Sequence, residues 1–332
     1  MITISDIDPA FPSDRWPIAA AMLPFPSAQD ASADTWQDHL AEVAFEGFTE
    51  VDVTDSWVRV GDLEPSRLTE LADVLTRTNL RPEAVSAIRR SVIHPQDGDA
   101  NLAYSHRTID AAAQLGCSVV SVGLHRPLTA AQREVLWFWT VDGPRDDDST
   151  ETWDLAVSRL RELGEHAADA GVALSLEMYE DTLLGSAQSA VRLVEDIAHP
   201  SVGLNPDLGN LFRLHRDIEG FAAAVEACLP VSNYWHVKNY HRDTDPSGTV
   251  VAVPAPMYAG SMNYRQAIKA ALEVGFSGAF CVEHYGGDGL SVMAENRTYL
   301  RKILAVATGE VARAGRAGTL APFAATTDGG AR

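Results

Sequence analysis

The chain has 332 residues, of which 46% are hydrophobic and 22% are charged, and its formal net charge is −20 at pH 7. This is the composition of a globular protein that can bury a large core, and it argues against wholesale disorder. The negative charge repels phosphate backbones and anionic lipid surfaces, so we expect neither nucleic acids nor membranes as partners. The longest apolar stretches are shorter than the roughly 20 residues of a membrane helix, and the first residues do not resemble a signal peptide.

Eight short apolar or alternating segments, each bounded by turn residues, predict β-strands. In chain order they are residues 16–23, 48–54, 82–88, 118–124, 172–178, 202–207, 232–238 and 278–284. Segments with helical periodicity follow them at residues 35–47, 65–78, 100–116, 152–171, 186–198, 216–229, 263–275 and 292–307. Eight strands that alternate with eight helices predict the α/β class and a single-domain, parallel (β/α)8 TIM barrel over residues 16–307, rather than two domains.

Two predicted connections are much longer than a simple link. Residues 125–150 follow the fourth strand and residues 239–262 follow the seventh, so both lie over the C-terminal mouth, where barrel enzymes have their active sites. Connections of this length are usually binding loops or lids, and a decorative insertion is the alternative. We expect residues 1–15 to form an N-terminal extension and residues 308–332 to form a flexible C-terminal tail.

The three cysteines, Cys117, Cys228 and Cys281, lie in separate apolar segments. Their odd number and the lack of a CxxC spacing in the sequence argue against both a disulfide framework and a thiolate metal site. We therefore expect reduced cysteines in the core of a cytoplasmic protein.

Acidic and histidine side chains stand at the carboxyl ends of the last four predicted strands. Side chains alternate between the two faces of a strand, and in a barrel one face meets the helices while the other looks into the interior. In the fifth strand Leu174 and Leu176 belong to the apolar outer face, which points Glu177 inward. The side chains that the same alternation brings to the inner face at these strand ends are Glu177, Asp207, His236 and Glu283. We expect them to converge at the barrel mouth.

These four side chains together favour a metal site. A single acid at a strand end is more often a helix N-cap or an ion-pair partner, and His236 alone is more often a core histidine. Three carboxylates packed together without a cation repel each other, and a divalent metal removes that conflict. Three oxygen donors and one imidazole suit Mn²⁺, Mg²⁺ or Co²⁺ better than a structural zinc, for which sulfur ligands are expected.

Four motifs resemble the xylose-isomerase-like barrels of the sugar isomerase and epimerase type. They are "LSLEMYE" on the fifth strand, "VGLNPDLGN" on the sixth, "WHVKNYHRD" on the seventh and "YAGSMNYRQAIKAALEVGFSGAFCVEH" leading into the eighth. The resemblance implies one divalent metal ion, with Mn²⁺ favoured over Mg²⁺ and Co²⁺, held by Glu177, Asp207, His236 and Glu283. Family epimerases often have a histidine three residues after the aspartate of the sixth strand, where this chain has Asn210. An asparagine can bind a substrate hydroxyl but cannot shuttle a proton.

The resemblance also implies a reaction. A metal that polarises a carbonyl acidifies the neighbouring C–H, and Glu177 and Glu283 are the expected catalytic groups that remove and return the proton. The expected function is therefore isomerisation or epimerisation of a keto-sugar or polyol derivative, a small-molecule carbohydrate. The expected substrate contacts are His125, Trp139, Asn210, Lys238 and His241. A plain ion pair for Lys238, a surface position for His125 and a loop anchor for Trp139 are the alternatives.

Other functions of the same fold remain to be weighed. If a leaving group lies next to the carbanion, the same proton abstraction leads to elimination, so a lyase that dehydrates keto-inositols or cleaves 3-keto C-glycosides is the main alternative. Related barrels imply a homo-oligomer or, for the C-glycoside enzymes, a small accessory subunit. The phosphodiester-cleaving branch binds several zinc ions through many histidines, and the charge of −20 argues against it. A barrel that only binds a sugar does not need the full ligand set.

Overall fold

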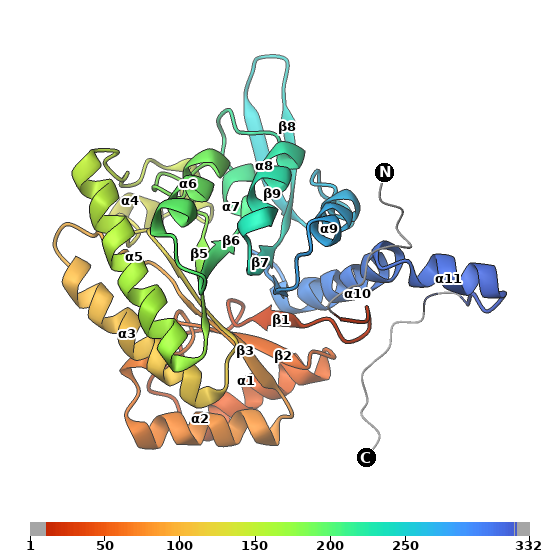
Figure 1. Cartoon of the computed structure of the whole chain (residues 1–332), viewed down its shortest axis with the longest axis horizontal. Coiled ribbons are helices and arrows are strands. Elements are labelled where there is room, and N and C mark those ends of the chain that lie inside the picture. Colours follow the sequence, from red (N-terminus) through yellow and green to blue (C-terminus); the bar gives the residue numbers. More distant parts are fainter. Residues whose placement is uncertain (1–10, 322, 324–332) are drawn as a thin grey trace.

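A parallel barrel forms the centre of the computed structural model, which describes residues 11–321 and 323 (Figure 1). Its eight strands follow the order β6-β5-β4-β3-β2-β1-β10-β7, and a parallel bridge from Leu204 to Ser232 joins the two ends. The strands are β1 Ile18–Ala21, β2 Glu50–Thr54, β3 Arg81–Ala87, β4 Val119–Gly123, β5 Ala173–Glu177, β6 Val202–Asn205, β7 Tyr234–Val237 and β10 Ala279–Val282. Each overlaps a predicted strand, so the predicted (β/α)8 TIM barrel is confirmed.

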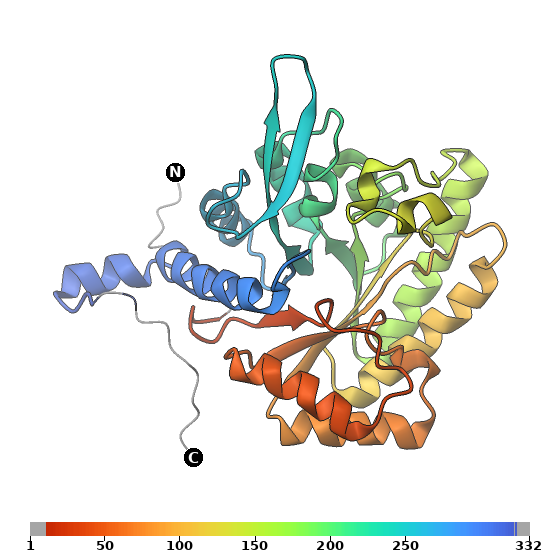
Figure 2. The ribbon, with the colours of Figure 1, turned by 180° about the vertical axis from the view of Figure 1, so that it is seen from behind.

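Helices surround the barrel (Figure 2). The principal helices are α1 Ala33–Phe45, α2 Pro65–Arg77, α3 Gly98–Leu115, α5 Thr150–Ala170, α6 Ala187–Ile197, α8 Phe221–Cys228, α9 Tyr264–Glu273 and α10 Gly289–Ala307. Shorter turns of helix are η2 Val60–Asp62, α4 Ala130–Arg133, η3 Phe138–Thr140, α7 Leu208–Phe212 and η4 Leu229–Val231. The helix predicted from residue 216 begins only at Phe221, because Gly220 is its N-cap in extended conformation. Gly116 and Gly171 end α3 and α5 with φ angles of 81° and 76°, which glycine adopts without strain.

The two faces of the strands build two different layers of core. Outward side chains such as Leu174 and Phe280 pack with the helices in the large hydrophobic core. The inward side chains form a separate cluster of mostly small residues, namely Ala19, Ala21, Ala84, Val119, Tyr234, Ala279 and Cys281. Because these side chains are small, the interior has room for polar groups near the carboxyl ends of the strands. All three cysteines are free and buried, as predicted for reduced core cysteines.

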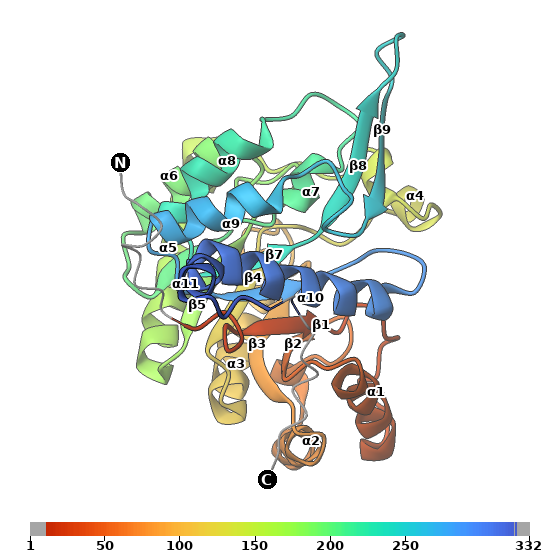
Figure 3. The same ribbon diagram turned by 90° about the vertical axis from the view of Figure 1, so that its right-hand side faces the viewer.

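The long connections carry structure that the sequence analysis did not anticipate. Residues 239–262 contain an antiparallel hairpin of β8 Asn239–Thr244 and β9 Val250–Ala255, which projects from the barrel (Figure 3). Residues 125–150 contain α4 and η3, and Thr129 and Gln132 form a capping box at the start of α4. In the segment predicted to be a flexible tail, residues Glu310–Ala317 form helix α11. Residues 1–10 of the predicted N-terminal extension lie outside the described residues, as do 322 and 324–332 of the tail.

Among the helices of the described residues, none is both long and apolar enough to cross a lipid bilayer.

Candidate metal centre

The carboxyl ends of four strands bring three carboxylates to one imidazole nitrogen. Glu177 ends β5, Asp207 is the N-cap of α7 directly after β6, His236 lies in β7 and Glu283 follows β10. Nδ1 of His236 lies 3.0 Å from Oε1 of Glu283, and 4.0 Å from both Oε2 of Glu177 and Oδ2 of Asp207. All four side chains are buried. The four residues that the sequence analysis selected as ligands therefore share one site.

Two neighbouring side chains donate hydrogen bonds to these carboxylates. Nζ of Lys238, which is buried, donates to Oδ2 of Asp207 and to Oε2 of Glu283. Nδ2 of Asn210 donates to Oε1 of Glu177 at 3.2 Å and to Oδ2 of Asp207 at 2.9 Å. Lys238 thus forms the ion pairs that were its alternative interpretation. The donors of Asn210 point at the protein's own carboxylates.

The two glutamates have different acid–base properties. Burial raises the pKa of Glu177 to about 7, and His236 and Lys238 offset this only in part. Burial also raises the pKa of Glu283, but Lys238 and His236 outweigh it, so the pKa lies below its ordinary value. Burial raises the pKa of Asp207, which Lys238 opposes. Glu283 is therefore held ionised, whereas Glu177 can gain and lose a proton near neutral pH.

The donor set fits a hard divalent cation. Within the described part of the chain, Nδ1 of His236 and Oδ1 of Asp207 are buried atoms without a hydrogen-bond partner. Ligand atoms of Glu177, Asp207 and His236 all lie within 4.8 Å of one another. Oxygen-rich sets with one imidazole suit Mg²⁺, Mn²⁺ or Co²⁺. Buried charges of one sign in such a cluster require a counter-charge.

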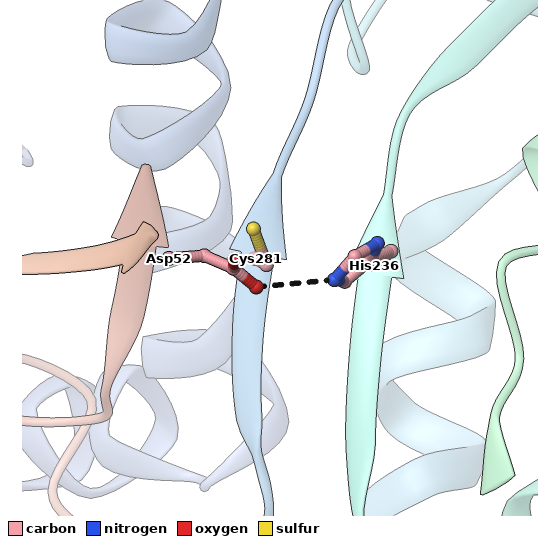
Figure 4. A group of neighbouring side chains, drawn as sticks. All are labelled: Asp52, His236 and Cys281. Atoms are coloured by element: carbon pink, nitrogen blue, oxygen red, sulfur yellow. Dashed lines mark ion pairs between the residues drawn. The ribbon is translucent and has the colours of Figure 1, made fainter. Parts of the chain in front are cut away.

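A second polar layer lies below the imidazole, inside the barrel. Nε2 of His236 is 3.4 Å from Oδ2 of Asp52 on β2 (Figure 4). It is also 3.3 Å from Oγ of Ser86 on β3. The sequence analysis missed Asp52. In the stretch "EVDVT" the residues Val51 and Val53 face outward, so the alternation that located Glu177 also points Asp52 inward.

An aromatic wall covers the site. Trp139 of η3 meets the rings of Tyr240 and Tyr285 edge-on, with centroid distances of 6.0 and 6.1 Å. The guanidinium of Arg213 lies over Trp139, 4.7 Å from its ring centroid. Nη2 of Arg213 donates to both carboxylate oxygens of Glu180 at 3.0 Å. These contacts fasten residues 125–150 to the barrel, as the alternative role of Trp139 as a loop anchor predicts, and its contact with a substrate stays a prediction.

His125 lies buried beside this wall. Its ring stacks on Tyr179 with a centroid distance of 4.2 Å, and a Cβ at Gly123 would lie 2.5 Å from two of its ring atoms. Burial lowers the pKa of His125 well below its ordinary value, and Arg89 adds to this effect, so the ring is neutral near pH 7. His125 is thus no surface histidine, and the small size of Gly123 gives its ring room.

The structure does not bring His241 to this site. His241 is exposed on β8, whereas the preceding Tyr240 is buried. The side chains at the even positions contact the interior and the site: Tyr234 contacts Asp52, His236 contacts Glu283, Lys238 contacts Asp207 and Tyr240 contacts Trp139. His241 has the opposite parity, so its side chain points outward. The sequence analysis also missed Arg213 and Glu180, because single charged residues in loops leave no spacing signal.

Polar atoms without a partner gather around the centre. Besides Nδ1 of His236 and Oδ1 of Asp207, the buried atoms without a hydrogen-bond partner among the described residues include both ring nitrogens of His125, Nε1 of Trp139, the hydroxyl of Tyr240, Nε and Nη1 of Arg213 and Oδ1 of Asn210. Leaving such groups unpaired costs about 1–3 kcal/mol each. A ligand that carries several hydroxyl or carbonyl groups can satisfy them.

The fold and the cluster together define a TIM barrel with a candidate metal centre at the carboxyl ends of its strands. The family model for xylose isomerase-like TIM barrels matches residues 38–303, and the chain belongs to this family. None of the curated protein sequences compared with the chain matches it.

Solved structures resemble the chain over nearly its whole length. A xylose isomerase-like TIM barrel protein from Mycobacterium smegmatis, solved in complex with magnesium, shares 44% identity with a TM-score of 0.86, covering 90% of this chain and 99% of that one. An L-ribulose 3-epimerase shares 16% identity with a TM-score of 0.64, covering 93% and 100%. A mannonate dehydratase from Streptococcus suis shares 14% identity with a TM-score of 0.64, covering 92% and 96%. At these lower identities the likeness concerns the fold alone.

Proposed function

We propose that the protein is a divalent-metal-dependent isomerase or epimerase of a keto-sugar or polyol derivative. The observation that carries this proposal is the convergence of Glu177, Asp207 and Glu283 on Nδ1 of His236. The magnesium in the similar Mycobacterium smegmatis protein supports a divalent cation. The L-ribulose 3-epimerase and the mannonate dehydratase of similar fold support carbohydrate chemistry.

Glu177, Asp207, His236 and Glu283 would hold the cation, for which Mn²⁺ is the first candidate and Mg²⁺ and Co²⁺ are alternatives. When bound, the cation supplies a Lewis acid that polarises a substrate carbonyl and acidifies the adjacent C–H. All further steps fall to side chains of the chain itself.

Glu177 is the proposed general base. Its Oε1 accepts a hydrogen bond from the neutral amide of Asn210, whereas Oε2 of Glu283 accepts one from the ammonium of Lys238. A positively charged donor lowers the basicity of a carboxylate more than a neutral donor does. Glu177 is therefore the better proton acceptor. Glu283 is the proposed partner that returns a proton when the configuration is inverted.

The substrate would lie under the aromatic wall. His125, with neither ring nitrogen bonded within the described structure, offers a donor and an acceptor to hydroxyl groups. Tyr240 offers its hydroxyl and Trp139 its indole N–H, while the rings supply apolar surface for a sugar face. Lys238 is close enough to the carboxylates to stabilise negative charge on a substrate oxygen. Asn210 can contribute only its Oδ1 to the substrate.

A lyase is the second candidate, and the different pKa values of Glu177 and Glu283 favour it. Inversion by two bases needs one glutamate to be protonated while the other is ionised, and Lys238 keeps Glu283 ionised. Elimination needs only one base, because the electron pair leaves with the departing group instead of being protonated. A keto-inositol dehydratase or a 3-keto C-glycoside-cleaving subunit, the latter with a small accessory subunit, fits this scheme.

Turnover in D₂O distinguishes the two candidates. The Mn²⁺-loaded protein is given keto-sugars, keto-inositols and 3-keto glycosides, and the products are analysed by mass spectrometry and NMR. Deuterium uptake without loss of a group identifies an isomerase or epimerase, and loss of water or aglycone identifies a lyase.

Matched variants test the residues. Glu177→Gln and Glu283→Gln should each lower kcat by about 100-fold or more, since positioned proton transfer contributes about 10²–10⁴-fold. Glu162→Gln, an exposed acid on α5, should leave kcat unchanged. Wild-type turnover in both site variants would contradict the proposal.

A further inference from the structure

The second nitrogen of His236 has partners of its own. Asp52, Ser86 and Tyr234 lie on the inner faces of β2, β3 and β7, and all three are buried. The hydroxyl of Tyr234 donates to Oδ2 of Asp52 at 2.6 Å, and the hydroxyl of Ser86 donates to the same oxygen at 2.7 Å. Nε2 of His236 lies 3.4 Å from this oxygen. Oδ2 of Asp52 therefore contacts two hydroxyl groups and the imidazole.

These contacts determine which nitrogen of the imidazole carries a proton. A neutral imidazole has one N–H and one lone pair, and a cation binds only the nitrogen with the lone pair. Both neighbours of Nε2 can accept its N–H: Oδ2 of Asp52 already accepts from two hydroxyls, and the hydroxyl hydrogen of Ser86 is donated to Asp52, which leaves the oxygen of Ser86 free to accept. The tautomer with the proton on Nε2 leaves the lone pair of Nδ1 facing Glu177, Asp207 and Glu283.

We propose that Asp52 is the positioning residue of the metal centre, which fixes the tautomer and the ring orientation of His236 and thereby sets the affinity for the cation. This inference rests on the proposed function, because it requires His236 to be a ligand. Asp52 does not reach the cation itself: it contacts the nitrogen on the opposite side of the ring (Figure 4). An acid behind a ligating histidine also makes the imidazole a better donor, and its loss costs about 10- to 100-fold in metal affinity.

Cys281 also lies close to this pair, and ligand atoms of Asp52, His236 and Cys281 lie within 4.8 Å of one another. A second cation at this point is the competing interpretation. Oδ2 of Asp52 already receives two hydroxyl hydrogens, and a buried thiol among acids is a poor source of thiolate. The geometry therefore favours positioning over a second metal site.

Titration calorimetry with Mn²⁺ alone, without substrate, tests the inference on the full chain. Asp52→Asn keeps the size of the side chain, but its amide can donate to Nε2 and so stabilises the tautomer with the proton on Nδ1. We expect this variant to bind one Mn²⁺ about 10- to 100-fold more weakly than wild type. Asp55→Asn is the matched control, because Asp55 lies three residues further along and contacts Ile88 and Arg90 instead of His236. It should bind Mn²⁺ like wild type.

The imidazole ¹⁵N NMR spectrum of the Mg²⁺-loaded protein gives a readout that a merely structural role would not change. Wild type should show the proton of His236 on Nε2, and Asp52→Asn should shift it toward Nδ1. Tyr234→Phe, which keeps the acid and removes one donor, should lose less affinity and keep the wild-type tautomer. If Asp52→Asn proves unstable, Tyr234→Phe combined with Ser86→Ala keeps the acid but removes both hydroxyls that orient its carboxylate; it should lower the affinity by more than Tyr234→Phe alone.

The possible failures are distinguishable. Unchanged Mn²⁺ affinity and an unchanged ¹⁵N spectrum in Asp52→Asn, with normal binding by wild type, would overturn the inference and leave the proposed function intact. Two Mn²⁺ per wild-type chain and one in Asp52→Asn would make Asp52 a ligand and overturn the positioning role. Wild type that binds no divalent cation would remove the metal centre, and with it both proposals.

Discussion

The buried ion pair of Arg213 and Glu180 offers a quantitative test of how the aromatic wall is held. Arg213 is fully buried, and Glu180 is nearly so. Burial alone would lower the pKa of Arg213, but the charge of Glu180 more than compensates for it, so the guanidinium stays charged. Glu180→Gln keeps the shape of the side chain and removes the counter-charge. Because a positive charge would then remain buried and uncompensated, the free energy of unfolding should fall by about 3–5 kcal/mol.

Thermal and urea unfolding measure this loss. For a chain of 332 residues, the expected destabilisation corresponds to a decrease of about 4–7 °C in Tm. The matched control is Asp196→Asn, which removes the acid of the exposed pair between Arg192 and Asp196. Such exposed pairs contribute about 0–1 kcal/mol, so the control should unfold close to wild type.

A double variant separates the uncompensated charge from lost packing. Replacing both members by apolar residues of similar size, in Glu180→Leu with Arg213→Met, removes the buried charge together with its partner. We expect this variant to be more stable than Glu180→Gln, because buried pairs can be replaced by packed apolar residues at little cost. If Glu180→Gln loses less than about 1 kcal/mol, the guanidinium reaches water or another partner, and the reasoning about the wall is wrong.

Three further predictions follow from other buried groups. Burial raises the pKa of Asp55 from 3.8 to about 6, so the folded chain binds more protons than the unfolded chain between these values. Its contribution to stability, measured by urea unfolding against Asp55→Asn, should therefore be lost as the pH rises from 4 to 7, by up to about 3 kcal/mol; a pH-independent difference would contradict this. Burial raises the pKa of Cys228 to about 12 and raises the pKa of Cys117 and Cys281 further. A thiol reagent at pH 8 should therefore react slowly with the native protein and should label all three thiols once the protein is unfolded. Rapid labelling of the native protein would show that a cysteine is accessible. Gly123→Ala should displace the ring of His125 and raise KM more than it lowers kcat if His125 binds substrate; unchanged kinetics would remove that role.

Periodicity was sufficient to predict the barrel, because its signal is repeated along the chain. Each strand is a short apolar run, and the alternation inside it separates outward Leu174 and Leu176 from inward Glu177. The convergence of the four selected side chains follows once the strands are parallel, since the same end of every strand faces one mouth.

The features that the sequence did not predict depend on contacts between segments that are distant in sequence. The hairpin β8–β9 starts at Asn239, whose amide donates to the carbonyls of Met257 and Met262, and Arg242 of β8 donates to the carbonyl of Phe212. The local pattern of "NYHRDT" predicts neither the hydrogen bonds of Asn239 nor that of Arg242. Arg213 and Glu180 are 33 residues apart and meet only because α7 follows β6 beside the end of β5. The alternation of side chains along a strand, by contrast, can be read from the sequence. Applied to these two strands, it predicts that His241 points outward and Asp52 points inward.

The charges of the centre account for the valence of the expected cation. Glu177, Asp207 and Glu283 carry up to three negative charges when ionised, and Lys238 supplies one positive charge through its bonds to Asp207 and Glu283. Without a cation the carboxylates outweigh burial and raise the pKa of His236 well above its ordinary value. Once the imidazole gives up that proton to serve as a ligand, three minus one leaves two negative charges, which a divalent ion balances and a monovalent ion does not. Without the cation, the excess negative charge adds to burial in raising the pKa of Glu177. Lys238 and Asn210 keep the carboxylates together through hydrogen bonds, so the proposed ligands are already oriented for a cation.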